Sequence, residues 1–225
     1  MERGRSRKAR SGCLGRIFGF VLFLIVAAVG VIAAVKYMPS RERADLDALY
    51  AAGGSDRVAL YLNYERQEES GVYVDGQTYL PAAWVDANLN ERFYWDANEE
   101  ILVYALPEEI VKSDETTVDE DGKKILYRDG DAVYLSLALI QKYTDVRLQA
   151  YDGEAQKRVF VENNWDPVTV ADAAWSAKIR LRGGLKSPIV TEIKRGGTVT
   201  VLEQYDNWAR VMTPDGHIGY MHKWK

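Results

Sequence analysis

The sequence predicts a mainly β protein with short helices that begins with a transmembrane helix, and three observations predict this class. Residues 17–35 form an uncharged run near the N-terminus. From residue 57 onward, several segments alternate apolar and polar residues with a period of two, as half-buried strands do. Asp-Gly and Gly-Gly pairs separate these segments, as turns do. We therefore expect a transmembrane helix, a duplicated β-β-α-β-β domain and a small β-barrel, in that order.

The composition excludes several kinds of site. The 225 residues are 47% hydrophobic and 28% charged, which is typical neither of a disordered chain nor of one wholly embedded in a membrane. One cysteine excludes a disulfide scaffold, and the two histidines, His217 and His222, lie five positions apart on strand-like sequence, which would point them to opposite faces. The nucleophile-elbow and phosphate-loop motifs are absent. We expect no catalytic residue, no metal, no cofactor and no nucleic-acid partner.

The N-terminus has the pattern of a membrane anchor. Residues 1–16 hold six basic residues and one acid, which predicts a basic cytoplasmic tail. A helix over residues 17–35, at about 1.5 Å per residue, spans roughly 28 Å, close to the thickness of the hydrocarbon core. The anchor residues are Ile17, Phe20, Leu24 and Val35. This orientation places the rest of the chain outside the cell; the alternative is a cleaved signal sequence, whose apolar region is usually shorter.

Charge divides the chain into three blocks. The net charge is +6 over residues 1–36, −13 over residues 37–165 and +3 over residues 166–225. Within residues 36–56, apolar residues with helical spacing precede a Gly-Gly pair, which predicts a juxtamembrane stalk helix over residues 40–52. The alternative for this segment is a helix that binds a partner.

Residues 57–165 contain one order of elements twice, after a first strand at residue 57. Each copy has a strand, an Asp-Gly turn, a strand, a short helix and two closing strands, and Asp75-Gly76 and Asp129-Gly130 lie 54 positions apart. The predicted helices cover residues 82–89 and 137–143, and the closing strands cover residues 91–95, 101–105, 146–151 and 158–162. Between the copies, residues 112–124 predict a solvated loop, because their acids lack the spacing of a calcium-binding loop.

The first copy resembles a known family. Its run V-x-V-D-G-x-x-Y-L-P and the later W-D pair resemble the copper amine oxidase N-terminal-like domain of bacterial surface proteins. The residues that carry the resemblance are Tyr79, Leu80, Pro81, Trp95 and Asp96. In the second copy, Ser136 stands in place of the proline and Tyr151-Asp152 in place of Trp-Asp. Because residues 37–165 contain no histidine, the resemblance does not imply copper binding.

The last unit, residues 166–225, is a predicted small barrel. Its five short strands are predicted over residues 178–182, 189–193, 198–203, 208–212 and 218–222. The order resembles a bacterial SH3 domain, and the final Asp215-Gly-His-Ile-Gly-Tyr220 is the most specific part of the resemblance. The first loop, Gly183-Gly-Leu-Lys186, departs from the family's Ser-Gly-Pro-Ser-like turn. The resemblance implies binding of peptidoglycan or another envelope polymer.

Side chains of this SH3-like unit are candidates for ligand binding. They are Arg182, Tyr205, Trp208, Tyr220 and Trp224. Aromatic rings can stack on sugars or peptides, and a basic unit can approach a polyanionic wall. The alternatives are that Trp208 and Tyr220 belong to the core, and that Arg180 and Arg182 form a solvated strand face because they alternate with apolar residues.

These observations predict a membrane-anchored, extracellular, non-catalytic protein that presents a module for binding the cell wall or a partner. The order of units also resembles the N-terminal half of clostridial surface proteins that often continue into a family 18 glycoside hydrolase. The hydrolase signature D-x-x-D-x-D-x-E is absent from this chain. The alternative function is the targeting portion of such a hydrolase, acting on cell-wall or chitin-like polysaccharide with its catalytic barrel outside this chain. A sensor of an extracellular ligand is a third hypothesis, although a sixteen-residue tail is short for a signalling domain.

Overall fold

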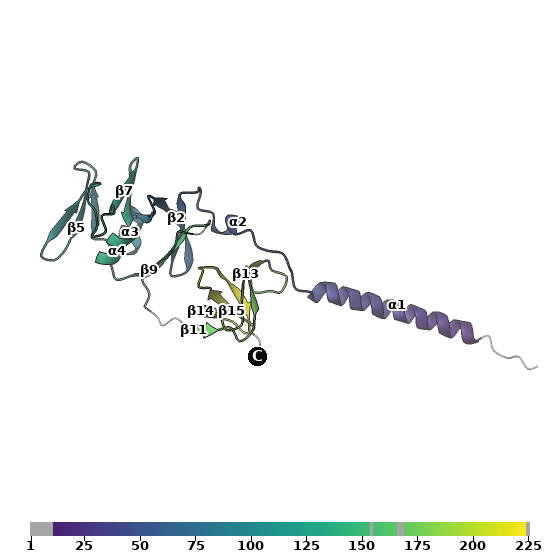
Figure 1. Ribbon diagram of the computed structural model, residues 1–225. Coiled ribbons are helices and arrows are strands. Elements are labelled where there is room, and N and C mark those ends of the chain that lie inside the picture. The colour runs from purple at the N-terminus through teal and green to yellow at the C-terminus, as the bar shows by residue number, and fades with distance from the viewer. Residues whose placement is uncertain (1–10, 154, 166–168, 224–225) are drawn as a thin grey trace, which may run out of the picture.

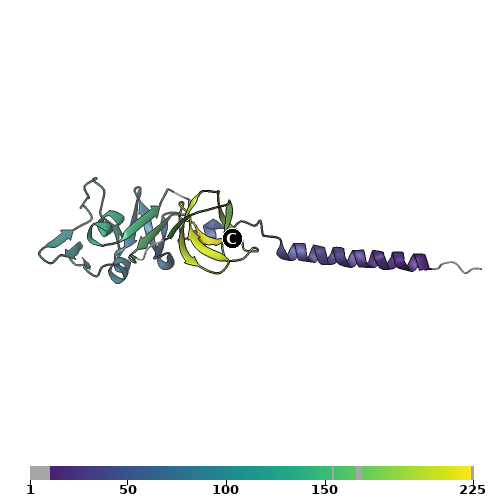
Figure 2. The same cartoon turned by 90° about the horizontal axis from the view of Figure 1, so that it is seen from below.

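The computed structural model describes residues 11–153, 155–165 and 169–223, whose arrangement Figure 1 shows. One long helix extends away from a mainly β body that has two parts. We call residues 57–162 the large domain and residues 169–223 the barrel. The same arrangement is visible in the perpendicular view of Figure 2.

Helix α1 (Ser11–Tyr37) confirms the apolar helix predicted near the N-terminus. Its segment Ile17–Tyr37 is long and apolar enough to cross a membrane, and its most apolar stretch is not buried against the rest of the protein. The predicted anchor residues have exposed fractions between 49% and 65%: Ile17, Phe20, Leu24 and Val35. Such a helix fits a single-pass anchor or a signal sequence.

The stalk helix predicted over residues 40–52 is wrong for its first half. Only α2 (Leu46–Tyr50) is helical there, and its N-cap Asp45 accepts a hydrogen bond from the Ala48 amide at 3.1 Å. Tyr50 is buried. The segment therefore packs on the body of the protein and does not stand apart from it as a stalk.

Residues 40–44, which we call the strap, run along an edge of the barrel. That edge is strand β13 (Ile189–Ile193). The Ala44 amide donates to the Ile189 carbonyl at 2.8 Å, and the Ile189 amide donates to the Glu42 carbonyl at the same distance. An edge strand exposes unpaired backbone groups, and the strap forms hydrogen bonds with them. The strap is therefore extended and not helical, because a short isolated helix is only marginally stable in water.

A seven-stranded sheet forms the centre of the large domain. Its order is β7-β8-β3-β2-β1-β10-β9, in which β1 and β10 are parallel and the other neighbours antiparallel. The strands are β1 (Arg57–Leu62), β2 (Glu65–Val74), β3 (Gln77–Pro81), β7 (Leu126–Asp129), β8 (Ala132–Ser136), β9 (Arg147–Tyr151) and β10 (Arg158–Glu162). Helices α3 (Ala82–Asn88) and α4 (Leu137–Tyr143) contribute Trp84 and Ile140 to the same hydrophobic core as the sheet's Leu80.

The closing strands of the two predicted copies occupy different places. Strands β9 and β10 of the second copy join the central sheet beside β1. Strands β4 (Phe93–Asp96) and β5 (Ile101–Ala105) of the first copy form a separate sheet with β6 (Ile110–Ser113). The loop predicted over residues 112–124 is therefore wrong at its start, because residues 112 and 113 pair with β5 and Ser113 is buried.

The barrel is a six-stranded sheet around its own core. Its order is β11-β14-β15-β16-β12-β13, and the core includes Ile179, Val199 and Val211. Besides β13, the strands are β11 (Thr169–Asp172), β12 (Ala177–Arg180), β14 (Thr198–Gln204), β15 (Trp208–Met212) and β16 (Ile218–His222). All five strands predicted for this unit are present within two residues of the expected bounds.

Arg180 is buried, so its assignment to a solvated strand face is wrong. Arg180 lies opposite Tyr220 of β16 and shares the outward side of the sheet with it, while Ile179 points into the barrel core. The strap and Ser187 cover this outward side, and Arg180 donates hydrogen bonds to the Ser40 and Ser187 carbonyls, so it is only 3% exposed.

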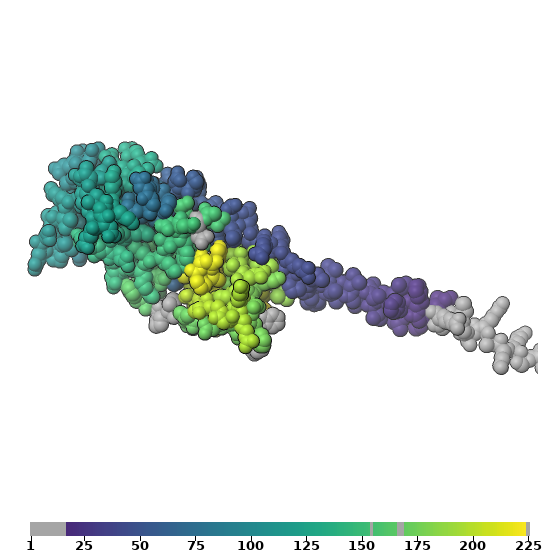
Figure 3. Space-filling view, in the orientation of Figure 1, coloured from purple at the N-terminus to yellow at the C-terminus, as the bar shows by residue number. Residues whose placement is uncertain are grey.

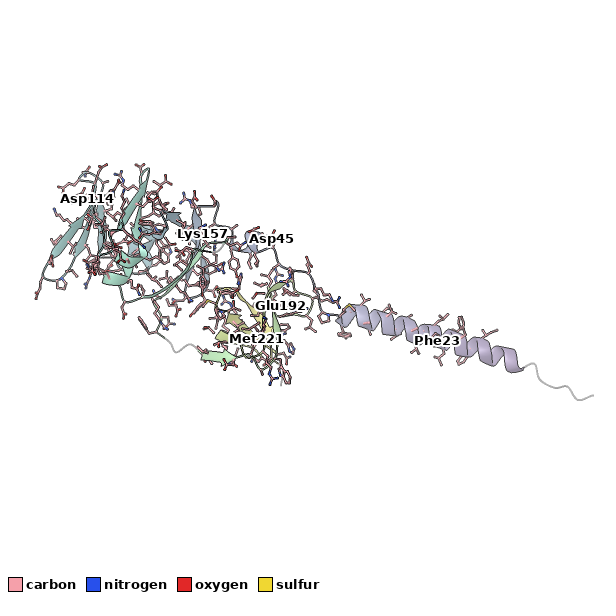
Figure 4. All side chains as sticks on the ribbon, viewed as in Figure 1. Phe23, Asp45, Asp114, Lys157, Glu192 and Met221 are labelled. Atoms are coloured by element: carbon pink, nitrogen blue, oxygen red, sulfur yellow. The ribbon has the colours of Figure 1, made fainter. Side chains whose placement is uncertain are left out.

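The barrel lies between α1 and the large domain, although it comes last in the sequence. Figure 4 shows Glu192 and Met221 of the barrel between Phe23 of α1 and Asp114 of the large domain. The space-filling view in Figure 3 shows the barrel in contact with both the large domain and the chain that leaves α1. The order of units along the chain is therefore not their order in space.

Candidate functional site

Strands β15 and β16 present two rows of side chains on the outside of the barrel. Ala209 and Val211 of β15 point into the barrel core, so Trp208, Arg210 and Met212 point outward. The residues directly opposite them on β16 are His222, Tyr220 and Ile218, respectively. Opposite residues in an antiparallel pair share a face. We call these six side chains the outer face.

The large domain covers one half of the outer face. Met212 and Ile218 pack in one hydrophobic cluster with Tyr50, Tyr61 and Phe160. The Tyr61 and Phe160 rings stack with centroids 4.7 Å apart, and the Tyr50 hydroxyl accepts a hydrogen bond from the Ile218 amide at 3.2 Å. Burial raises the pKa of Tyr50 to about 12, so its hydroxyl stays protonated in this seam. We call Met212 and Ile218 the covered half.

A buried arginine joins the covered half to the loop beside it. Arg158 of β10 is 0% exposed, and its guanidinium donates to the carbonyls of Gln156 at 2.8 Å, Gly216 at 3.0 Å and Asp215. The same guanidinium lies 4.7 Å from the centroid of the Tyr50 ring. These contacts replace the water that the guanidinium loses on burial.

The loop that receives Arg158 belongs to the motif Asp215-Gly-His-Ile-Gly-Tyr220. Gly216 has a φ of +72°, and a Cβ there would lie 2.5 Å from the Tyr151 ring of the large domain. Only glycine satisfies both the left-handed backbone and the close approach of the ring. Asp215 also contacts the Nδ1 atom of His217 at 2.8 Å, which holds the loop in shape. In this protein the motif therefore docks the barrel on the large domain.

The other half of the outer face is open. The Tyr205 ring, just after β14, lies 6.0 Å from the Tyr220 ring, and 46% of Tyr205 is exposed. Trp208 packs edge-on against His222 with centroids 4.9 Å apart, and Gly183 lies against its indole ring. We call Trp208 and Tyr220 of the outer face, together with the neighbouring Tyr205, the open half. They offer ring surface that no other part of the described chain covers completely.

A carboxylate orients the open half. The Tyr205 hydroxyl donates a hydrogen bond to Glu203, which raises the pKa of Tyr205 to about 12. The same hydrogen bond lowers the pKa of Glu203, since it stabilises the ionised carboxylate. At neutral pH, Glu203 is therefore an acceptor and Tyr205 a fixed donor.

Arg210 connects the open half to the large domain. Its guanidinium lies 3.0 Å from Glu203 within the barrel and 2.5 Å from Glu65 of β2. It also donates to the Tyr64 carbonyl at 2.9 Å. The ion pairs are partly exposed, so we expect modest stabilisation together with a fixed orientation of both carboxylates.

A groove of about 500 Å³ follows this seam between the two domains. Its lining from the large domain and α2 includes Leu49, Tyr61 and Tyr64, and its lining from the barrel includes Tyr205 and Tyr220. Rings bordered by carboxylates and a guanidinium can stack on a sugar or peptide and bind its polar groups. Among the described residues, no group of three or more His, Cys, Asp and Glu side chains could hold a metal ion.

The structure brings together some of the predicted ligand residues. Tyr205, Trp208 and Tyr220 lie together at the open half, and none of the three belongs to the barrel's hydrophobic core cluster. Arg182 is exposed on the loop after β12, and Trp224 lies outside the described residues. Sequence reasoning did not find Tyr64, Glu65 or Arg210. No local pattern marks the first two, because they lie about 145 residues before their partner in the chain.

The decisive comparison concerns the barrel. Residues 175–224 match the bacterial SH3 domain family. The barrel is a bacterial SH3 domain. The match does not extend to residues 57–165, and it supports neither the copper amine oxidase N-terminal-like resemblance nor a continuation into a glycoside hydrolase. No curated protein and no solved structure matches the chain.

Proposed function

We propose that this is a membrane-anchored, extracellular, non-catalytic protein whose SH3 domain binds peptidoglycan or another envelope polymer at the open half of the outer face. The observation that carries the proposal is the cluster of the exposed Tyr205 with the partly exposed Trp208 and Tyr220 on a bacterial SH3 domain. The groove beside it adds Glu65, Glu203 and Arg210 as polar contacts.

The N-terminal segment supports the anchor and its orientation. The segment Ile17–Tyr37 is apolar, and six basic residues precede it within residues 1–16. Basic flanks are retained in the cytoplasm, so the SH3 domain would lie on the outer side of the membrane. The net charge of +3 over residues 166–225 favours approach to a polyanionic wall.

We also propose that the large domain is a duplicated unit of the copper amine oxidase N-terminal-like type. The two hairpin-and-helix units meet at the antiparallel pair of β3 and β8, where Leu80 lies opposite Leu135. On either side, Tyr79 lies opposite Ser136 and Pro81 opposite Tyr134. Pro81 and Ser136 are the N-caps of α3 and α4, so the pairing is symmetric about the two leucines. A local twofold axis of this kind supports duplication.

Sedimentation with purified peptidoglycan tests the binding proposal. The full chain in detergent should co-sediment with the polymer, and Tyr205→Ala and Tyr220→Ala should weaken binding by roughly three- to tenfold, the usual contribution of one stacked ring. The matched control is Tyr94→Ala, because Tyr94 is an exposed ring of the large domain. Equal binding by all three variants, or no binding by the unmodified chain, would contradict the proposal.

A further inference from the structure

The loop between β12 and β13 touches the end of α1. The Lys186 Nζ atom lies 2.5 Å from the Val35 carbonyl oxygen, and the Ser40 amide donates to the Leu185 carbonyl at 2.8 Å. This loop therefore brings the SH3 domain into contact with the apolar helix. Figures 1 and 2 both show the barrel beside the end of α1.

Pro39 explains why the Val35 carbonyl is free to accept a hydrogen bond from Lys186. In an α-helix the carbonyl of residue 35 would accept the amide hydrogen of residue 39, but Pro39 has none. The Lys186 ammonium supplies the missing donor and places a positive charge at the helix C-terminus, where the dipole favours it.

Arg180 holds the loop against the strap. Its buried guanidinium donates to the Ser40 carbonyl at 3.2 Å and to the Ser187 carbonyl at 2.6 Å. One side chain thus binds both the strap and the far end of the loop. Since the strap follows α1 directly, the loop cannot move away from the helix end without breaking these bonds and those to Ile189.

The surface around this contact is cationic. Residues 36–43 and 181–187 contain five Lys or Arg side chains and a single acid, Glu42. Arg43 is paired with Glu192, whereas Arg41, Arg182 and Lys186 are exposed. Exposed apolar side chains lie among them, namely Tyr37, Met38 and Leu185. Aromatic and apolar side chains mixed with Lys and Arg are typical of the membrane interface.

We propose that the loop of residues 182–186, together with Lys36 and Arg41, binds the phosphates of anionic phospholipids in the leaflet from which α1 emerges. The proposal rests on the proposed membrane anchor, because α1 brings the loop to the headgroup layer. It reassigns Arg182 from the polymer-binding site to the lipid surface. It also leaves the rings of the open half available to a polymer, although Trp208 of the open half lies against Gly183 of this loop.

Quenching of a fluorescent label on the loop by lipid headgroups in nanodiscs tests the lipid-binding proposal. The full chain with Cys13→Ser and Leu185→Cys carries one bimane label on the loop, and a lipid with a nitroxide headgroup acts as quencher. We expect severalfold stronger quenching at position 185 than at Asp131→Cys, an exposed turn of the large domain. Phosphatidylglycerol should increase the quenching, and 1 M salt should remove that increase, because the Debye length falls to about 3 Å.

Charge variants provide the matched comparison. Arg182→Glu with Lys186→Glu should abolish the increase caused by phosphatidylglycerol, whereas Lys194→Glu with Arg195→Glu makes the same charge change on another exposed turn and should preserve it. Equal quenching at positions 185 and 131, in nanodiscs that retain the chain, would overturn the proposal and leave the anchor intact. If the nanodiscs do not retain the chain, both the lipid-binding proposal and the proposed membrane anchor are overturned. An effect of soluble poly(glycerol phosphate) in place of phosphatidylglycerol would assign the surface to a wall polymer.

Discussion

The two halves of the outer face begin from the same local pattern and end in different environments. Trp208 and Met212 lie on one strand, on one side of it, four residues apart. Met212 is buried under the large domain, whereas Trp208 remains partly exposed. The difference arises from Arg158 and Tyr151, which belong to another domain and hold the loop at Gly216. One strand face can thus serve both as an interface and as a candidate binding surface, depending on what packs against each end.

The largest effect is expected from Arg158→Ala, which removes the buried contact at the covered half. Three carbonyls lose a charged donor and the ring of Tyr50 loses a partner, so we expect a loss of about 3 kcal/mol in unfolding free energy. Chemical denaturation of the full chain in detergent measures it. The control, Arg147→Ala, removes a partly exposed arginine 3.7 Å from Glu162 and should cost less than about 1 kcal/mol. Equal losses would show that Arg158 does not hold the seam.

Gly216→Ala should have the next largest effect, about 2 kcal/mol of destabilisation. The added Cβ requires both a left-handed backbone and a displacement of the Tyr151 ring. Gly130→Ala is the matched control, because Gly130 also has a positive φ, 62°, but no atom near its Cβ position. Thermal unfolding of the two variants compares them. If they lose the same stability, the approach of Tyr151 contributes nothing.

The ion pair at the border between the two halves should give a smaller effect. A double-mutant cycle of Glu65→Gln and Arg210→Gln should yield a coupling of about 0.5–1 kcal/mol, which falls at 1 M salt. Arg43 and Glu192 form a more exposed pair, 3.5 Å apart, whose coupling should be near zero. A larger coupling for the exposed pair would contradict the importance of the seam.

The smallest effect is a pH dependence in the open half. The hydrogen bond from Tyr205 lowers the pKa of Glu203 in the folded state. The ionised Glu203 therefore stabilises the fold above its unfolded-state pKa, and this stabilisation is lost as the pH falls through its folded-state pKa. We expect Tm between pH 5 and pH 3 to fall slightly less for Glu203→Gln than for the unmodified chain. Parallel thermal scans at several pH values measure the difference, and identical slopes would contradict it.

Much of the fold was predictable from local signals. The Asp-Gly turns, the short helices and the strands of the barrel depend on nearby residues, and the structure contains them. The separate sheet of β4, β5 and β6 and the extended strap were not predicted, because strand pairing depends on which edge is free nearby. Arg180 was misassigned because the strap, a distant segment of the chain, covers the outward side of strand β12 where Arg180 lies.

The candidate site also contains residues that the sequence could predict and residues that it could not. The aromatic residues 205, 208 and 220 could be selected from their type and from the SH3 pattern of the last sixty residues. Glu65 and Tyr64 could not, since they reach Arg210 only after the domains dock.

By itself, the sequence determined the apolar helix, the mainly β class and the presence of an SH3 domain, because periodicity, charge and turn residues act over a few positions. Only the tertiary structure decided that the barrel lies beside the helix end, that half of its outer face is covered, and that its first loop meets α1. These features depend on a few long-range contacts, Arg158 to Gly216, Arg180 to Ser40 and Lys186 to Val35. Such contacts join residues whose separation along the chain carries no local signal.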